Sequence, residues 1–276
     1  MAPSGAPTID FIRSADATKL AYRHWPIADA SLTLAVLHGL GEHSGRYERF
    51  AQGMAPFGME TYAVDLRGHG NSAGQKGHVD SWSQWIDDAA AFFSHVESQA
   101  AQEVVPLGHS FGGAVMLSAV LAGKVPRARR FVLSSPALKL KVAVPSWKAS
   151  LGRITSQIAP RLTMNNEVDA RTISRIPEVV EAYRTDPFVH GKISSRTFAE
   201  WQRAAIENVE HAGEIKIPFL IVAGSDDALI DPDGSRRLHE RAPTSELHIF
   251  EGRYHEPFND RGSEEVFALI ARWLGK

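Results

Sequence analysis

The chain has 276 residues, with 30 basic and 32 acidic side chains and a formal net charge of −2. This balance speaks against a protein that binds nucleic acid phosphates. Cysteine is absent, which excludes disulfides, thiolate metal sites and a cysteine nucleophile. The N-terminus lacks the apolar stretch of a secretion signal and no apolar run reaches the length of a membrane span, so we expect a cytoplasmic location.

Short apolar runs alternate with helical stretches along the chain, which predicts βαβ units around a mostly parallel sheet. Residues 8–13 and 19–24 predict an opening hairpin. Continuous apolar runs suit strands that are covered on both faces. Such runs predict strands at 33–38, 60–65, 104–107, 130–134, 219–223 and 246–250. Helices are predicted near 47–56, 82–99, 113–121, 233–241 and 264–274.

The segment 139–214 interrupts this alternation and contains no predicted strand. Apolar residues recur there at spacings of three or four, which predicts a helix with one apolar face. These residues are Trp147, Leu151, Ile154, Ile158 and Leu162. We favour a helix that packs on its own domain. The nearby lysines and arginines also suit an amphipathic segment at a membrane surface.

The pattern Gly-x-Ser-x-Gly occurs twice, around Ser72 and around Ser110. A nucleophilic serine of this pattern sits on a sharp turn between a strand and a helix, with small residues on either side. Ser110 follows a predicted strand and precedes a predicted helix, whereas Ser72 lies in a polar, glycine-rich loop. We therefore predict that Ser110 is the nucleophile and that Ser72 is structural.

A serine nucleophile needs a base that takes its proton and a carboxylate that orients this base. Both are expected on loops after late strands, with the acid before the base along the chain. His255 follows the last predicted strand and is our predicted base. Asp226 and Asp227 both follow the strand at 219–223, and their spacing does not decide between them; Asp231 is explained by the start of a helix.

Acyl chemistry also needs backbone N–H donors that stabilise the developing oxyanion. We predict these donors at Phe111, directly after the nucleophile, and at Leu40, in a loop between glycines after an early strand. The same loop has a rival interpretation as a dinucleotide-binding turn, but its glycine spacing departs from the usual fingerprint. No metal-binding or nucleotide-binding motif of regular spacing is present, so we expect no cofactor.

Several runs together resemble the monoacylglycerol lipase and lysophospholipase branch of the α/β-hydrolase fold. These runs are 38–47, 65–72, 108–113, 224–227 and 254–255, and the resemblance covers nearly the whole chain. It implies that Asp227 is the acid, and that a helical cap at 139–214 is inserted into a core of residues 1–138 and 215–276. It further implies that Glu42, Arg46 and Tyr183 lie near the polar head group of the substrate.

We therefore expect a serine hydrolase that cleaves a monoacylglycerol-like ester through an acyl-enzyme, without a cofactor. The expected partner is a small lipid ester, with transient membrane contact through the cap. Within hydrolases the alternatives are a lysophospholipase or a short-chain carboxylesterase, and behind them an aminopeptidase. A ligand receptor without enzymatic activity is the alternative from another class, because one fold serves many functions.

Overall fold

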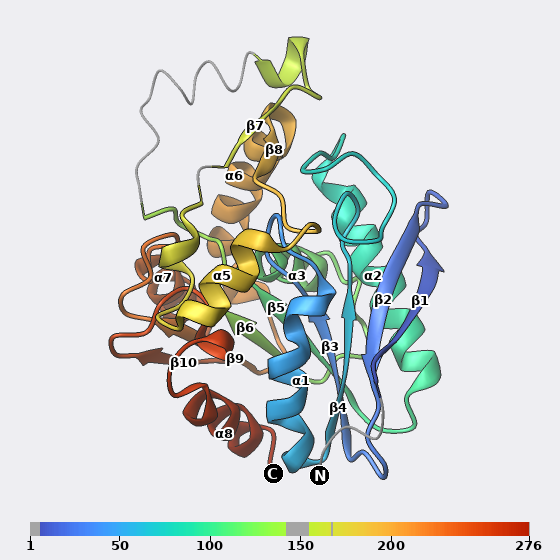
Figure 1. The fold of residues 1–276 in the computed structure, drawn as a ribbon, viewed down its shortest axis with the longest axis vertical. Helices are drawn as coiled ribbons and strands as arrows, with labels where there is room; N and C mark the ends of the chain where they lie inside the picture. The colour runs from blue at the N-terminus through green and yellow to red at the C-terminus, as the bar shows by residue number, and fades with distance from the viewer. Residues whose placement is uncertain (1–5, 142–154, 167, 276) are drawn as a thin grey trace.

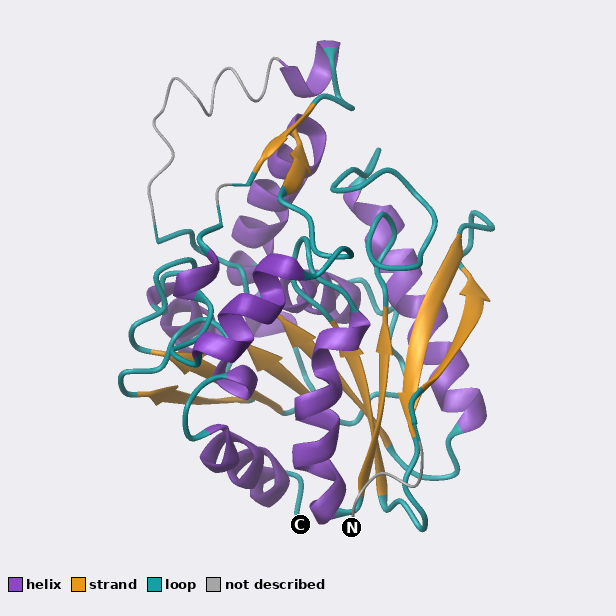
Figure 2. Ribbon diagram, viewed as in Figure 1, coloured by secondary structure: helices purple, strands orange, loops and turns teal. Residues whose placement is uncertain are grey.

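A mixed sheet of eight strands lies at the centre of the fold (Figures 1 and 2). The computed structural model describes residues 6–141, 155–166 and 168–275. The strand order is β1-β2-β4-β3-β5-β6-β9-β10; β2 runs antiparallel to both neighbours, and the other adjacent pairs are parallel. The strands are β1 (Thr8–Arg13), β2 (Lys19–Trp25), β3 (Leu32–Leu37), β4 (Met59–Val64), β5 (Val104–His109), β6 (Phe131–Ser134), β9 (Phe219–Gly224) and β10 (Ser245–Phe250).

Helices cover both faces of the sheet. The side chains of a strand alternate between the two faces, so one apolar strand packs against helices on both sides. In β3, Leu34 and Val36 join one apolar cluster and Ala35 and Leu37 join the other. The first cluster includes α1 (Glu48–Met54) and α8 (Ser263–Trp273). The second includes α2 (Trp82–Gln99), α3 (Phe111–Leu121) and α7 (Asp233–Arg241). The predicted α/β fold is confirmed.

The parallel strands place the loops that follow β5, β9 and β10 at one edge of the sheet. Carboxyl ends of neighbouring parallel strands meet at the same edge, where open α/β sheets bind their ligands. Short 3-10 turns occur in the insertion and in connections at both edges of the sheet. They are η1 (Ser44–Tyr47), η2 (Ala55–Phe57), η3 (Ala170–Thr172), η4 (Ala212–Glu214) and η5 (Pro257–Asn259).

A largely helical insertion lies between β6 and β9, above this edge in Figure 1. It contains α5 (Pro177–Thr185) and α6 (Ser195–Glu210). It also contains β7 (Thr163–Asn165) and β8 (Lys192–Ser194), which pair in antiparallel fashion. The expectation of no strand in this segment is therefore wrong. Each strand has three residues, too few for an alternating pattern, and the partner lies far along the chain.

The apolar face predicted for residues 147–162 is only partly visible. Trp147, Leu151 and Ile154 lie outside the described residues. Ile158 is 77% exposed and Leu162 is 55% exposed. These two side chains do not pack on the domain, contrary to the interpretation that we favoured. Among the described residues, no helix has both the length and the apolar character needed to cross a membrane.

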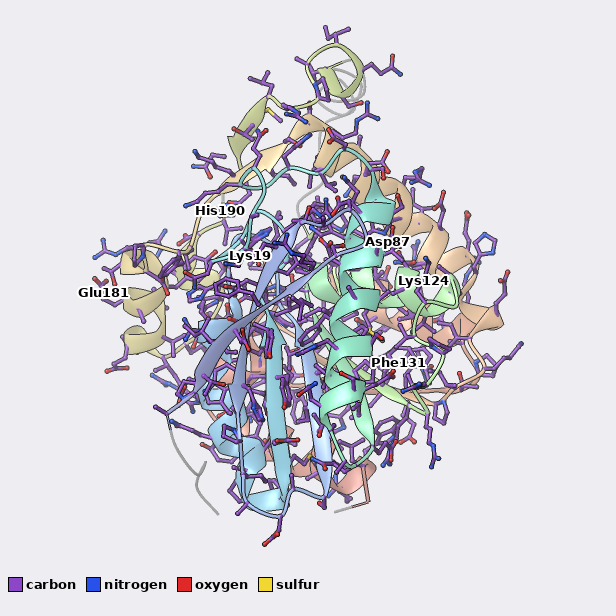
Figure 3. All side chains as sticks on the ribbon, turned by 90° about the vertical axis from the view of Figure 1, so that its right-hand side faces the viewer. Lys19, Asp87, Lys124, Phe131, Glu181 and His190 are labelled. Carbon is purple, nitrogen blue, oxygen red and sulfur yellow. The ribbon has the colours of Figure 1, made fainter. Side chains whose placement is uncertain are left out.

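Buried hydrogen bonds attach the insertion to the rest of the chain. The indole of Trp201 on α6 donates to the carbonyl of Ala137, at 2.7 Å. His190, labelled in Figure 3, donates its backbone N–H to the carbonyl of Gly41, at 2.8 Å. His43 Nε2 lies 2.8 Å from a carboxylate oxygen of Asp186. The insertion thus contacts the loop after β3 as well as the segment that follows β6.

Candidate active site

Ser110 occupies a strained turn between β5 and α3. Its φ of 52° and ψ of −119° lie in a region that non-glycine residues rarely adopt. The turn brings chain segments so close that its glycines have no room for a side chain: a Cβ on Gly112 would lie 2.3 Å from the Leu37 carbonyl oxygen, and one on Gly108 would lie 2.7 Å from the Gly112 carbonyl oxygen. The Gly-x-Ser-x-Gly pattern is thus a steric requirement of this turn.

The structure brings Ser110, His255 and Asp227 into one hydrogen-bonded chain. His255 Nε2 lies 2.9 Å from Ser110 Oγ. His255 Nδ1 lies 2.7 Å from Asp227 Oδ2. All three residues are buried, with Ser110 the most exposed at 9%. An imidazole whose Nδ1–H points at a carboxylate presents Nε2 as an acceptor to the serine hydroxyl.

Asp227, rather than either neighbouring aspartate, faces His255. Its second oxygen accepts backbone N–H groups from Leu229 and Ile230, both at 2.9 Å, so the carboxylate is held in place. Asp226 is exposed and accepts a hydrogen bond from Ser225 Oγ. Asp231 pairs with Lys139. Of the three aspartates, Asp227 is therefore the one that the structure places against His255.

The loop after β3 lies directly beside the nucleophile. A Cβ on Gly39 would lie 3.3 Å from Ser110 Cβ. Leu40, the predicted oxyanion donor, is the residue next to Gly39. The N–H of Phe111 is the first of helix α3 and has no acceptor within the helix. His38 is structural, because its Nε2 accepts the N–H of Leu66 and its Nδ1 lies 2.7 Å from the Gly39 carbonyl.

Glu42 and Arg46 belong to a buried charge network beside the site. Arg46 donates to Glu42 at 2.8 Å and to both oxygens of Glu256, at 2.6 and 2.8 Å. Glu42 also accepts the N–H of Gly39, at 2.6 Å. Burial favours the neutral acid, but attraction to Arg46, His109 and His38, together with the Gly39 hydrogen bond, outweighs burial and lowers the pKa of Glu42. The aromatic ring of Tyr183 lies 4.6 Å from the Arg46 guanidinium. The network joins the loop after β3 to the His255 loop.

Glu256 is a residue of this site that the sequence reasoning missed. It directly follows His255, and its carboxylate forms a two-point contact with Arg46. A signal for it exists in the sequence, namely an acidic residue adjacent to the predicted base. Spacing provides no means of pairing it with Arg46, which lies 210 positions earlier.

The dinucleotide interpretation of the loop after β3 is wrong on steric grounds. A Cβ on Gly41 would lie 2.3 Å from the carbonyl oxygen of His190, so the insertion fills the space above this glycine. Asp65 directly follows β4, where a dinucleotide-binding fold has an acidic residue for the ribose. It instead accepts backbone N–H groups from Ser44 and Asn71. In the described part of the chain, no three His, Cys, Asp or Glu side chains are grouped so as to hold a metal ion.

A strained serine between a strand and a helix, hydrogen-bonded to a histidine and an aspartate on later loops, defines a serine hydrolase of the α/β-hydrolase fold. Comparisons with known proteins agree. The family model described as serine aminopeptidase, S33, matches residues 28–262. The monoacylglycerol lipase of Mycolicibacterium smegmatis is 31% identical over 93% of this chain and 92% of its own length.

Two further relatives extend this comparison. An uncharacterized abhydrolase domain-containing protein of Dictyostelium discoideum is 32% identical over 97% of this chain, which spans 29% of that longer protein. The crystal structure of the Paleococcus ferrophilus monoacylglycerol lipase superposes with a TM-score of 0.81 at 28% identity, covering 98% of both chains. The chain belongs to the serine aminopeptidase S33 family, in its monoacylglycerol lipase branch. By class it is a carboxylic ester hydrolase.

Proposed function

We propose that this chain hydrolyses carboxylic esters of monoacylglycerol-like lipids through an acyl-enzyme on Ser110. The observation that carries this proposal is the hydrogen-bonded chain from Ser110 Oγ through His255 to Asp227. The substrate class is supported by the similarity to proteins named monoacylglycerol lipases, which extends over nearly the full length of this chain.

In the first half of the reaction, Ser110 Oγ attacks the ester carbonyl carbon while His255 Nε2 accepts its proton. Asp227 holds the Nδ1–H tautomer and stabilises the imidazolium that forms. The N–H groups of Leu40 and Phe111 donate to the oxyanion of the tetrahedral intermediate. His255 then protonates the leaving alkoxide, and the glycerol-like alcohol departs from the acyl-enzyme.

In the second half, His255 removes a proton from water, which attacks the acyl carbonyl. The tetrahedral intermediate collapses, the fatty acid leaves, and the proton returns to Ser110. We propose that Glu42, Arg46 and Tyr183 flank the head-group end of the site, as the family resemblance implies. Both terminal nitrogens of Arg46 bond to carboxylates, so the guanidinium is held in a fixed orientation there.

Substrate class is tested by comparing the specificity constants kcat/KM for four ester or amide types. We expect a monoacylglycerol to exceed a lysophospholipid, a short nitrophenyl ester and an aminoacyl amide by about tenfold or more, a difference of about 1.4 kcal/mol in transition-state binding. A lysophospholipid in first place would favour a lysophospholipase, and an amide in first place an aminopeptidase. Failure of the wild-type serine to react with a fluorophosphonate would favour a receptor.

The pH dependence of kcat/KM reports the state of His255. Burial lowers the pKa of this group, but attraction to Asp227 and their hydrogen bond outweigh burial and raise it above 6.5. A histidine base is active only when neutral, so we expect kcat/KM to rise with pH through a midpoint above 6.5. Burial and the neighbouring His255 lower the pKa of His109 to about 4, which separates its titration from this midpoint. A midpoint below 6.5 would contradict the assignment.

We propose further that residues 139–214 act as a cap over the site and touch lipid surfaces transiently, from the cytoplasm. Exposed apolar side chains support a lipid contact. They are Ile158, at 77% exposed, Leu162, at 55%, and Met164, at 51%, all on this segment.

A further inference from the structure

Both residues that flank His255 are held by backbone hydrogen bonds. The N–H of Tyr254, before the histidine, donates to Asp260 Oδ2 at 3.1 Å. The N–H of Glu256, after it, donates to the carbonyl of Ile173 at 3.0 Å. Asp260 directly follows η5, whereas Ile173 belongs to the insertion between β6 and β9. Two separate parts of the chain thus hold the segment that carries His255.

Asp260 is fully buried and depends on Arg175 for its counter-charge. Its side chain is 0% exposed, whereas that of Arg175 is 30% exposed. Arg175 donates to this carboxylate through its backbone N–H, at 2.9 Å, and through Nε, at 3.0 Å. A buried carboxylate is stable in its charged form only when it is paired and hydrogen-bonded. Arg175 therefore supplies the counter-charge of Asp260 and helps to orient its carboxylate, which accepts the Tyr254 N–H.

Ser174, which lies between Ile173 and Arg175, adds a further contact between the insertion and the segment after His255. Ser174 Oγ donates to the carbonyl of Asn259, in η5, at 2.7 Å. Ile173 is 1% exposed and Ser174 is 2% exposed. Figure 1 shows the start of α5 beside the segment between β10 and α8. Three consecutive residues of the insertion, 173–175, thus contact Glu256, Asn259 and Asp260, which all follow His255.

We propose that Arg175 and Asp260 are positioning residues for His255, so that the insertion helps to place the general base as well as to cover the site. The inference rests on the proposed function, because it takes His255 to be that base. Neither residue touches the substrate. Loss of the guanidinium leaves the buried Asp260 without its counter-charge and without the Nε hydrogen bonds, so its carboxylate is less firmly oriented. The Tyr254 contact weakens, and the imidazole shifts relative to Ser110.

The test is the rate at which a fluorophosphonate labels Ser110, measured well below the melting temperature together with the final labelled fraction. We expect Arg175→Met to reach the wild-type fraction with a rate constant about 10- to 100-fold lower, because small displacements of a catalytic group are costly. Arg175→Lys should be intermediate, since lysine keeps the charge but not the planar geometry. Arg175→Lys also serves as the test variant if Arg175→Met does not fold.

The matched control is Arg130→Met. Arg130 forms a similar two-point contact with Glu103, both bonds at 3.0 Å, and its side chain is 25% exposed. It lies just before β6, at the opposite edge of the sheet from Ser110. We expect this variant to lose some thermal stability and to label at the wild-type rate. Equal loss of rate in Arg130→Met and Arg175→Met would overturn the inference.

A second comparison separates this inference from the proposed function. Wild-type protein that labels, together with Ser110→Ala protein that does not, supports the function. An Arg175→Met variant that then labels at the wild-type rate would overturn the positioning role alone. Wild-type protein that is not labelled would overturn the proposed function and this inference together.

Discussion

Ser110→Ala is expected to lower kcat for a monoacylglycerol by about ten thousand-fold to a million-fold, because no acyl-enzyme can form without the hydroxyl. The substitution removes one atom at a turn that the flanking glycines continue to accommodate. We therefore expect the melting temperature to stay close to that of the wild type. The measurements are steady-state rates at equal protein concentration and thermal unfolding followed by circular dichroism.

The matched control is the serine of the other Gly-x-Ser-x-Gly pattern. Ser72 Oγ donates to the Asp65 carbonyl and accepts the N–H of Ala21. We expect Ser72→Ala to lower the free energy of unfolding by about 1–3 kcal/mol, because a buried backbone group loses its partner. Its kcat per folded molecule should stay at the wild-type value. Ser110→Ala activity within tenfold of the wild type would contradict the nucleophile assignment.

Asp227→Asn is expected to lower kcat by about ten thousand-fold, by forcing the wrong tautomer on His255. The asparagine oxygen can still accept the N–H groups of Leu229 and Ile230, which leaves its NH2 facing His255 Nδ1. Nδ1 must then accept, and Nε2 carries the proton and can no longer receive one from Ser110. Steady-state kinetics across a range of pH measures the loss.

The control for this prediction is Asp226→Asn. Asp226 is exposed and contacts Ser225 rather than His255, so we expect an unchanged kcat. The loss of charge at Asp227 also removes the interaction that raises the pKa of His255. Any residual activity of Asp227→Asn should therefore show a midpoint at lower pH. Equal kcat values for the two variants would rule out Asp227 as the orienting acid.

The sequence predicts the fold and the place of the site because both depend on local patterns. Buried parallel strands appear as short apolar runs, and the residues after them meet at one sheet edge. Ser110 and His255 were selected in this way, and the structure brings them together. The choice of Asp227 over Asp226 needed the family resemblance, because neighbouring loop residues can point in opposite directions.

Features that depend on contacts between distant segments were not predictable from one sequence. The pairing of β7 with β8 joins three-residue strands that have no pattern of their own. The contact of Arg46 with Glu256 spans 210 positions, and that of Arg175 with Asp260 spans 85. Each partner alone is an ordinary charged residue. Only the folded chain shows that these charges are buried against one another.

The network around Arg46 also constrains how this site can change in evolution. Arg46 is the cation between Glu42 and Glu256, and all three side chains are less than 10% exposed. A mutation that removes one acid leaves the guanidinium paired with the other. A mutation that removes Arg46 leaves two acids facing each other out of water, at high cost. We therefore expect related proteins that lack the arginine at position 46 to lack the acids at positions 42 and 256 as well.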